Sequence, residues 1–131
     1  DRPGLALAVL TADCVPLLAA DDRAGVIGAA HAGRVGAVDG IVSALIGAMT
    51  SLGADPERIS VLLGPAAAGQ HYELPEDRRV DLRAGITRQL AGLGITRVDA
   101  DPRCTIADDT LFSYRRQGRT GRQASVIWRD A

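Results

Sequence analysis

Short apolar runs and longer amphipathic segments alternate along the chain. Residues 5–10, 25–31 and 59–64 are aliphatic runs bounded by turn-forming residues, a pattern typical of buried β-strands. Residues 95–100 and 123–128 mix apolar and polar positions and are further strand candidates. The pattern therefore predicts five strands distributed over the whole chain.

Two segments between these runs carry apolar side chains at helical spacing. The segment 37–52 predicts an amphipathic helix, and Gly53 follows it where a left-handed C-cap is expected. A second helix is expected to begin near Asp81 as its N-cap and to run to about Leu93, before Gly94 ends it. The apolar stripe of the first helix consists of Val38, Ile41, Val42, Leu45, Ile46, Met49 and Leu52.

The order of these elements predicts the fold class. No repeat, linker or low-complexity tract divides residues 1–131, so we expect a single domain of the α/β (α+β) class, a layered sheet-and-helix sandwich. Hydrophobic residues make up 47% of the chain, which is enough to build a core.

Composition narrows the range of partners and locations. A net charge of -1 gives no reason to expect nucleic acid or an anionic membrane as a partner, and no apolar run approaches the roughly 20 residues of a membrane span. Two cysteines without a signal-peptide pattern favour the reducing cytoplasm. All 15 basic residues are arginine, which excludes Schiff-base chemistry on a lysine of this chain.

Cys14 and His31 stand at the ends of neighbouring predicted strands. Cys14 comes directly after Asp13 where the first apolar run ends, and His31 ends the second run. If both strands end at the same sheet edge, the thiolate and the imidazole form a ligand pair that Zn²⁺ favours. The alternative is that Cys14 is a small core residue and His31 an ordinary polar residue at a strand end.

The segment after His31 reads AGRVGAVDG and predicts a strand-to-helix turn. Gly33 and Gly36 would permit a tight turn, whose free N–H groups favour an anion at the start of the helix. Arg34 could add a bidentate contact to phosphate or carboxylate. The alternative is that the glycines serve only the turn and that Arg34 is solvated.

Several short motifs together identify a family. The motifs, in chain order, are TADCVPLL, AAHAG, LLGPA followed by YEL, DPRCT, and FSYRRQGRTGRQASVIW. In this order and at this approximate spacing they resemble the polyphenol oxidase or laccase-domain family, the YfiH-like proteins, over essentially the whole length of the chain.

The resemblance implies a zinc-dependent purine nucleoside phosphorylase that cleaves adenosine, inosine, guanosine and methylthioadenosine, with adenosine deaminase as a second activity. Purine nucleosides and phosphate are then the expected ligands. In this family Cys14, His31 and a histidine upstream of the ADC motif would hold the zinc, and that upstream segment is not among these 131 residues. Asp13 is expected to orient a ligand or move a proton, or else to shape the turn. His71 is a weaker candidate for the missing ligand.

Phosphorolysis also requires groups that hold an anion. Besides Arg34, the arginines of SYRRQGRTGR could hold that anion. A nucleoside pocket could be lined by Tyr114, Arg115, Arg116 and Arg122, with solvated surface side chains as the alternative. Cys104 is expected to pack rather than to react.

The chain departs from the family pattern at two places. HAGRVG replaces the usual HAGWRG, so the substrate contacts of that turn differ. Only five residues, 75–79, separate YEL from VDL, where the family has a longer stretch.

Two other enzyme classes remain open from the sequence. A copper-dependent polyphenol oxidase would need histidine-rich copper sites, and the chain has two histidines. A cysteine hydrolase could use Cys14 as nucleophile and His31 as base.

Overall fold

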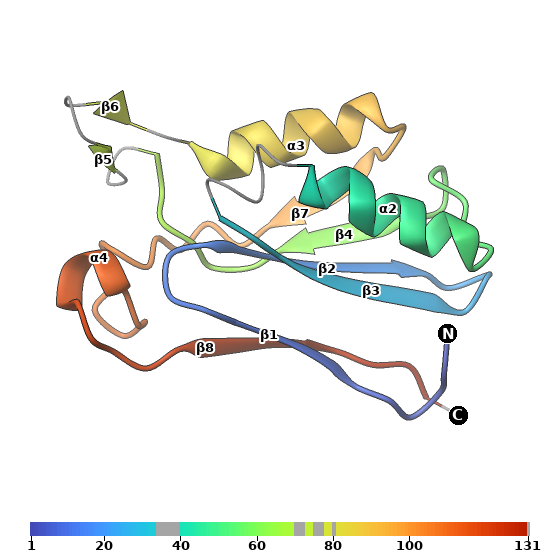
Figure 1. The fold of residues 1–131 in the computed structure, drawn as a ribbon, viewed down its shortest axis with the longest axis horizontal. Coiled ribbons are helices and arrows are strands. Elements are labelled where there is room, and N and C mark those ends of the chain that lie inside the picture. Colours follow the sequence, from blue (N-terminus) through green and yellow to red (C-terminus); the bar gives the residue numbers. More distant parts are fainter. Residues whose placement is uncertain (34–39, 70–72, 75–77, 80, 131) are drawn as a thin grey trace.

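The chain folds into layers: two helices, a four-stranded sheet and a two-stranded sheet (Figure 1). The computed structural model describes residues 1–33, 40–69, 73–74, 78–79 and 81–130, with the side chains of 73–74 and 78–79 left out. The predicted layered α/β fold is confirmed.

The central sheet has the strand order β3-β2-β4-β7. β2 (Val15–Asp21) pairs antiparallel with β3 (Val26–Ala32) on one side and with β4 (Ser60–Leu63) on the other. β7 (Arg97–Ala100) pairs parallel with β4. Because β2 lies between two strands and between two layers, most of its side chains are buried.

Helices α2 (Ile41–Ser51) and α3 (Leu82–Gly92) cover one face of this sheet (Figure 1). The apolar side of α2 packs closely on β3, since a Cβ built on Gly28 would lie 2.8 Å from Leu45 Cδ1. The predicted stop of the first helix at Gly53 and the predicted N-cap of the second at Asp81 are confirmed, whereas α2 begins at Ile41 with Gly40 as its N-cap and not at residue 37. Gly53 has φ +103°, and the Asp81 carboxylate accepts a hydrogen bond from the Ala84 N–H at 3.0 Å.

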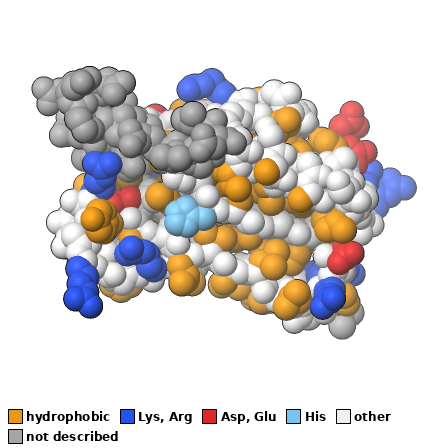
Figure 2. All heavy atoms as spheres, viewed as in Figure 1, with side chains coloured by type: hydrophobic (Ala, Val, Ile, Leu, Met, Phe, Trp, Pro, Cys, Tyr) orange, Lys and Arg blue, Asp and Glu red, His pale blue; other side chains and the backbone are white. Residues whose placement is uncertain are grey.

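The second sheet lies on the opposite face of the central sheet. β1 (Leu7–Thr11) and β8 (Gln123–Ile127) pair antiparallel and contact β2 and β3 (Figure 1). Apolar side chains gather at the surface where these two strands run, as Figure 2 shows in its lower part. The exposed large apolar residues of this face are Leu10, Val126 and, just after β8, Trp128.

Four elements were not predicted from the sequence. β2 begins directly after Cys14, the residue expected where the first strand ends. The other three are the one-turn helix α4 (Tyr114–Gln117) and the paired strands β5 (Glu73–Leu74) and β6 (Arg78–Arg79). No helix within the described parts of the chain is both long and apolar enough to cross a bilayer.

Candidate active site

The β2–β3 hairpin brings Cys14 and His31 to the same face of the central sheet. Pro16 pairs with His31 in the antiparallel ladder, so their side chains share one face, and Cys14 stands two residues before Pro16. Cys14 is therefore the diagonal neighbour of His31. The two residues approach through hairpin register rather than through two strands ending at one edge, because β1 belongs to the other sheet.

Both side chains face the layer formed by β1 and β8. A Cβ built on Gly64 would lie 2.6 Å from Pro16 Cγ and 3.1 Å from Ser125 Oγ of β8, which places Pro16 against that layer. Gly33 continues β3 beside Cys14, and a Cβ there would lie 3.0 Å from the Cys14 Sγ. Glycine at position 33 therefore leaves space next to the sulfur.

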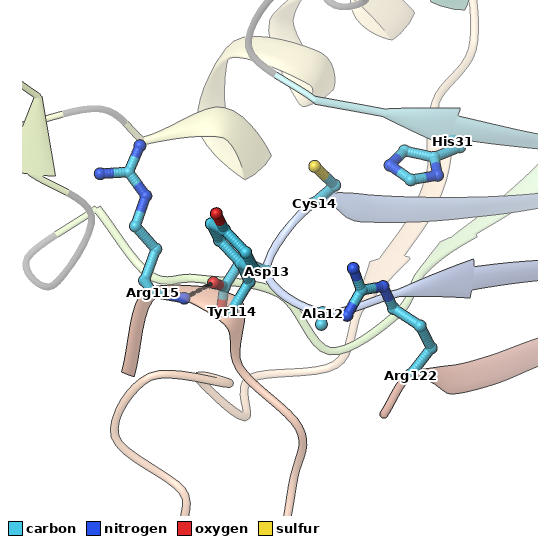
Figure 3. A pocket seen from close by; sticks show the side chains of 7 residues that line it. All are labelled: Ala12, Asp13, Cys14, His31, Tyr114, Arg115 and Arg122. Atoms are coloured by element: carbon cyan, nitrogen blue, oxygen red, sulfur yellow. Dashed lines mark hydrogen bonds between the residues drawn. The ribbon is translucent and has the colours of Figure 1, made fainter. Parts of the chain in front are cut away.

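A cavity of about 530 Å³ opens beside Cys14 and His31 (Figure 3). Three parts of the chain contribute to it: the β1–β2 turn, the end of β3, and the segment from α4 to β8. Its lining residues are Ala12, Asp13, Cys14, His31, Tyr114, Arg115 and Arg122. The cavity thus joins the predicted metal ligands to three of the predicted substrate-binding residues.

The charges around Cys14 act on its thiol in opposite directions. Burial, followed by the negative charge of Asp13, raises the pKa of the Cys14 thiol above its ordinary value. The guanidinium groups of Arg122 and Arg115 favour the thiolate and partly offset this effect. The balance keeps Cys14 protonated near neutral pH unless another cation or a base is supplied.

Asp13 forms the wall of the cavity nearest to Cys14. Its Oδ1 accepts hydrogen bonds from Thr105 Oγ1 and Ser113 Oγ, both at 2.7 Å, and its Oδ2 accepts one from the Arg115 N–H at 2.7 Å. Figure 3 shows the last of these bonds. Asp13 is 4% exposed, so its carboxylate is engaged in binding other parts of the protein.

Arg115 and Arg122 flank the opening of the cavity, with Cys14 between them in the view of Figure 3. Arg122 is exposed and donates to the carbonyls of Thr120 and Gly121 in its own turn. Tyr114 is 59% exposed at the same opening. These three residues can contact a ligand in the cavity.

Arg116 differs from its neighbour. Its guanidinium donates hydrogen bonds to four backbone carbonyls, which fixes the loop that precedes α4, and it does not line the cavity. The contacts shown for Arg116 are thus structural, and its binding of substrate stays a prediction. The four carbonyls belong to Thr105, Ile106, Asp108 and Leu111.

Other candidate residues lie outside the described residues or away from the cavity. Arg34, Gly36 and His71 belong to the part of the chain that is not described. Cys104 Sγ accepts a hydrogen bond from the Ala68 N–H at 3.2 Å and does not line the cavity.

The donor chemistry of the cavity fits two positions of a zinc site. A thiol and an imidazole on one wall, next to a residue without a side chain, match the ligand types that zinc prefers. Among the residues that the structure describes, no group of three or more His, Cys, Asp or Glu side chains is placed to hold a metal ion. A complete site would therefore need a ligand from outside them.

Sequence reasoning missed Thr105 and Ser113. Both stand within recognised motifs, DPRCT and FSYRR, but they are 92 and 100 residues from Asp13 in the chain. Hydroxyl side chains give little chemical signal of their own. Only the fold shows that they meet one carboxylate.

Comparisons with known proteins identify the family of the chain. The family described as multi-copper polyphenol oxidoreductase laccase matches residues 1–80 and 75–130. A protein of Corynebacterium glutamicum named purine nucleoside phosphorylase is 52% identical over 145 residues, covering 95% of this chain and 59% of that protein. A Mycobacterium tuberculosis protein of the same name is 50% identical, with 98% and 59% covered. The chain thus spans about three fifths of the length of these relatives.

Solved structures lead to the same family. The YfiH protein of Bacillus licheniformis superposes with a TM-score of 0.91 at 29% identity, over 99% of this chain and 60% of that one. YlmD from Geobacillus stearothermophilus gives a TM-score of 0.91 at 29% identity, over 100% and 59%. By sequence and by fold, this chain belongs to the multi-copper polyphenol oxidoreductase laccase family, as a YfiH-like protein.

Proposed function

We propose that the cavity is the active site of a zinc-dependent purine nucleoside phosphorylase with a second adenosine deaminase activity. The observation that carries the proposal is the meeting of Cys14 and His31 with two cavity-lining arginines, Arg115 and Arg122. Relatives named purine nucleoside phosphorylase support the substrate class.

The size and lining of the cavity suit a nucleoside together with phosphate. A volume of about 530 Å³ lies within the range of small-molecule sites. Guanidinium groups bind phosphate through paired N–H donors, and Arg115 and Arg122 are the cations in the lining. The ring of Tyr114 offers an aromatic surface to a purine. Adenosine, inosine, guanosine and methylthioadenosine are the proposed substrates.

In phosphorolysis, a phosphate oxygen forms a bond to the anomeric carbon of the ribose while the bond from that carbon to the base nitrogen breaks. The base leaves with the bonding electrons and is protonated, and ribose 1-phosphate remains. Positive charge develops on the sugar in the transition state, so a phosphate held beside it is stabilising. Arg115 and Arg122 would hold that phosphate in place, which lowers the entropic cost of the reaction.

Cys14 and His31 would hold the zinc ion with a third ligand from outside the described residues. When bound, zinc supplies a Lewis acid and activates water, which is the chemistry that deamination at the purine C6 requires. Cys14 would bind as the thiolate, which the nearby guanidinium groups favour. Glycine at position 33 would leave room for the ion beside the sulfur.

Two competing functions are weighed against this proposal. The family's description names copper, but the described cavity offers one imidazole, from His31, whereas oxidase copper sites need several. A cysteine hydrolase needs a lowered pKa at its nucleophile, whereas burial raises the pKa of the Cys14 thiol.

Metal analysis of the purified protein separates the three functions. We expect zinc to co-purify with the parent and to fall below a tenth of that level in Cys14→Ser and His31→Ala. Cys104→Ser serves as the matched control and should retain zinc, since Cys104 does not line the cavity. Copper in place of zinc would support the oxidase, and a metal-free enzyme inactivated by thiol alkylation would support the hydrolase. The C. glutamicum relative, assayed in parallel, shows what a longer family member binds.

A further inference from the structure

We propose that Asp13 is a positioning residue: its carboxylate, held by Thr105 and Ser113, sets where Arg115 stands relative to Cys14 and thereby sets the affinity of the cavity for phosphate. This assigns Thr105 and Ser113 to the working of the site. The inference rests on the proposed function only for the identity of the anion.

The hydrogen bonds of Asp13 leave little freedom to its carboxylate. Both oxygens accept from protein donors, and all three bonds are 2.7 Å long. Thr105 is fully buried, as is Ser113. Hydrogen bonds accepted by a buried, charged carboxylate are among the stronger hydrogen bonds in proteins. A group engaged in this way holds segments together, whereas proton transfer would need an oxygen facing the substrate.

The hydrogen bond between Ser113 and Asp13 fixes the start of α4. Ser113 is the N-cap of α4: its Oγ accepts a hydrogen bond from the Arg116 N–H at 3.1 Å and donates one to Asp13. A helix of four residues is too short to be stable alone, so its contacts at the cap determine its position. Because α4 carries Tyr114 and Arg115, Asp13 determines where these two cavity residues stand.

The backbone of Asp13 fixes the turn that carries Cys14. Asp13 has φ +112°, a left-handed conformation that is costly for a residue with a side chain. Its carbonyl accepts the Ala67 N–H at 2.9 Å, and the Ala12 carbonyl accepts the Tyr114 N–H at 3.4 Å. The turn before Cys14 and the start of α4 are therefore held by the same residue. A displaced carboxylate would change the spacing between Cys14 and Arg115.

Thr105→Val tests the proposal without altering Asp13 itself. It removes one hydroxyl donor and keeps the shape of the side chain. Thr110→Val is the matched control, because Thr110 Oγ1 donates to the Asp108 carboxylate at 2.6 Å in the same loop, away from the cavity. Thr105→Ser retains the hydroxyl and should restore the behaviour of the parent.

Two quantities are measured for each variant by NMR on the labelled chain. Titration with inorganic phosphate gives the affinity from the arginine Nε–H signals, and hydrogen exchange gives the protection of the Arg115 amide. We expect Thr105→Val to weaken phosphate binding and to speed Arg115 exchange, each by about tenfold. Thr110→Val and Thr105→Ser should change neither, and thermal unfolding checks that all variants are folded at the working temperature.

Should Thr105→Val fail to fold, Ser113→Gly replaces it. Glycine is tolerated at an N-cap, so this change mainly removes the second hydroxyl donor to Asp13. Affinity and exchange equal to those of Thr110→Val would overturn the proposal. A parent that binds no phosphate, together with fast Arg115 exchange in Thr105→Val alone, would refute the proposed anion site and still support the positioning role.

Discussion

At the residue scale, the surroundings of Cys14 decide which chemistry the cavity can perform. Burial and the carboxylate of Asp13 oppose the thiolate, while Arg122 and Arg115 favour it. The same two arginines are the cations that face the cavity. These surroundings suit a Cys14 thiolate that is bound to a metal cation. They also suit an anionic substrate bound by the two arginines.

Arg122→Ala tests the anion-binding role of these arginines. Loss of one charge-assisted contact should raise the phosphate concentration needed for half-maximal inosine cleavage by about tenfold to a hundredfold. Phosphate titration of the cleavage rate measures the effect. Arg119→Ala is the matched control, since Arg119 is exposed in the same segment and does not line the cavity. If Arg122→Ala and Arg119→Ala gave the same phosphate curve, Arg122 would be a solvated side chain and the anion would have to bind elsewhere.

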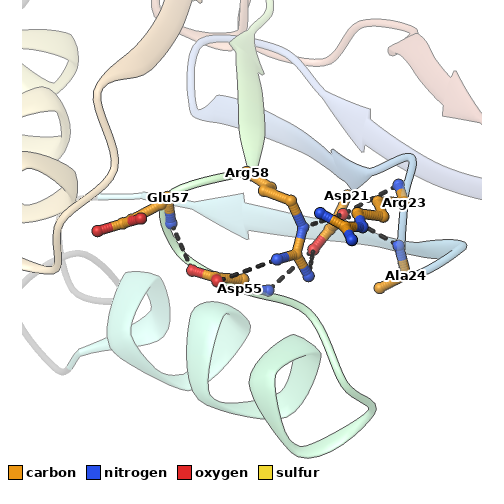
Figure 4. Close-up of polar contacts among 6 residues, drawn as sticks. All are labelled: Asp21, Arg23, Ala24, Asp55, Glu57 and Arg58. Carbon is orange, nitrogen blue, oxygen red and sulfur yellow. Dashed lines mark hydrogen bonds and ion pairs between the residues drawn. The ribbon is translucent and has the colours of Figure 1, made fainter.

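At the scale of single elements, the β2–β3 hairpin is held at both ends. Near the cavity its register sets Cys14 beside His31. At the far end Asp21, which closes β2, accepts hydrogen bonds from the N–H groups of Asp55 and Ala24 and pairs with Arg58 (Figure 4). The buried carboxylate of Asp21 thus joins the hairpin turn to the loop that follows α2.

The free energy of unfolding at low pH should depend on the ionisation of Asp21. The Asp55 N–H, together with the Ala24 N–H and Arg58, lowers the pKa of Asp21 from 3.8 to about 2. Because the folded-state pKa is lower than the unfolded one, the stabilisation is present above pH 3.8 and is lost as the pH falls through about 2. Urea unfolding between pH 7 and pH 2 measures this loss. In Asp21→Asn the free energy of unfolding should fall less steeply over that interval, and an unchanged slope would remove Asp21 as the cause.

Two glycines test how closely α2 packs on β3. Alanine at position 28 would place its Cβ 2.8 Å from Leu45 Cδ1 and from Met49 Sδ, so Gly28→Ala should destabilise the fold by about 1 kcal/mol or more. A Cβ at Gly47, within α2, meets nothing within 4 Å, and Gly47→Ala should stabilise the fold by about 0.5 to 1 kcal/mol. Denaturant midpoints measure both changes. Equal midpoints for the two variants would contradict the observed packing.

Prediction from sequence worked best for elements whose signal is local. The caps at Asp81 and Gly53 and the apolar stripe of α2 depend on neighbours in the chain, and they were found. β2 was missed because Asp13, Cys14 and Pro16 interrupt the apolar pattern at its start. From the sequence, Cys14 and His31 were expected to meet as a ligand pair, whereas the arginines were predicted from a separate motif. The role of Asp13 could not be predicted, because its partners lie about a hundred residues away.

At the scale of the whole molecule, the layers converge to form the cavity. The central sheet supplies His31, the turn between the two sheets supplies Cys14, and the segment from α4 to β8 supplies the arginines. Each of these three parts, taken alone, could be explained by its role in the fold. Their convergence at one end of the layers, in a chain that belongs to this family, supports an active site there.

The most direct test of the proposed function is whether inosine cleavage depends on phosphate. The protein, with the C. glutamicum relative as reference, is incubated with inosine in the presence and absence of phosphate, and hypoxanthine and ribose 1-phosphate are quantified. The proposal predicts that hypoxanthine release requires phosphate and is matched mole for mole by ribose 1-phosphate, while adenosine deamination continues without phosphate because its nucleophile is water. Equal hypoxanthine release without phosphate, with free ribose as the product, would contradict it.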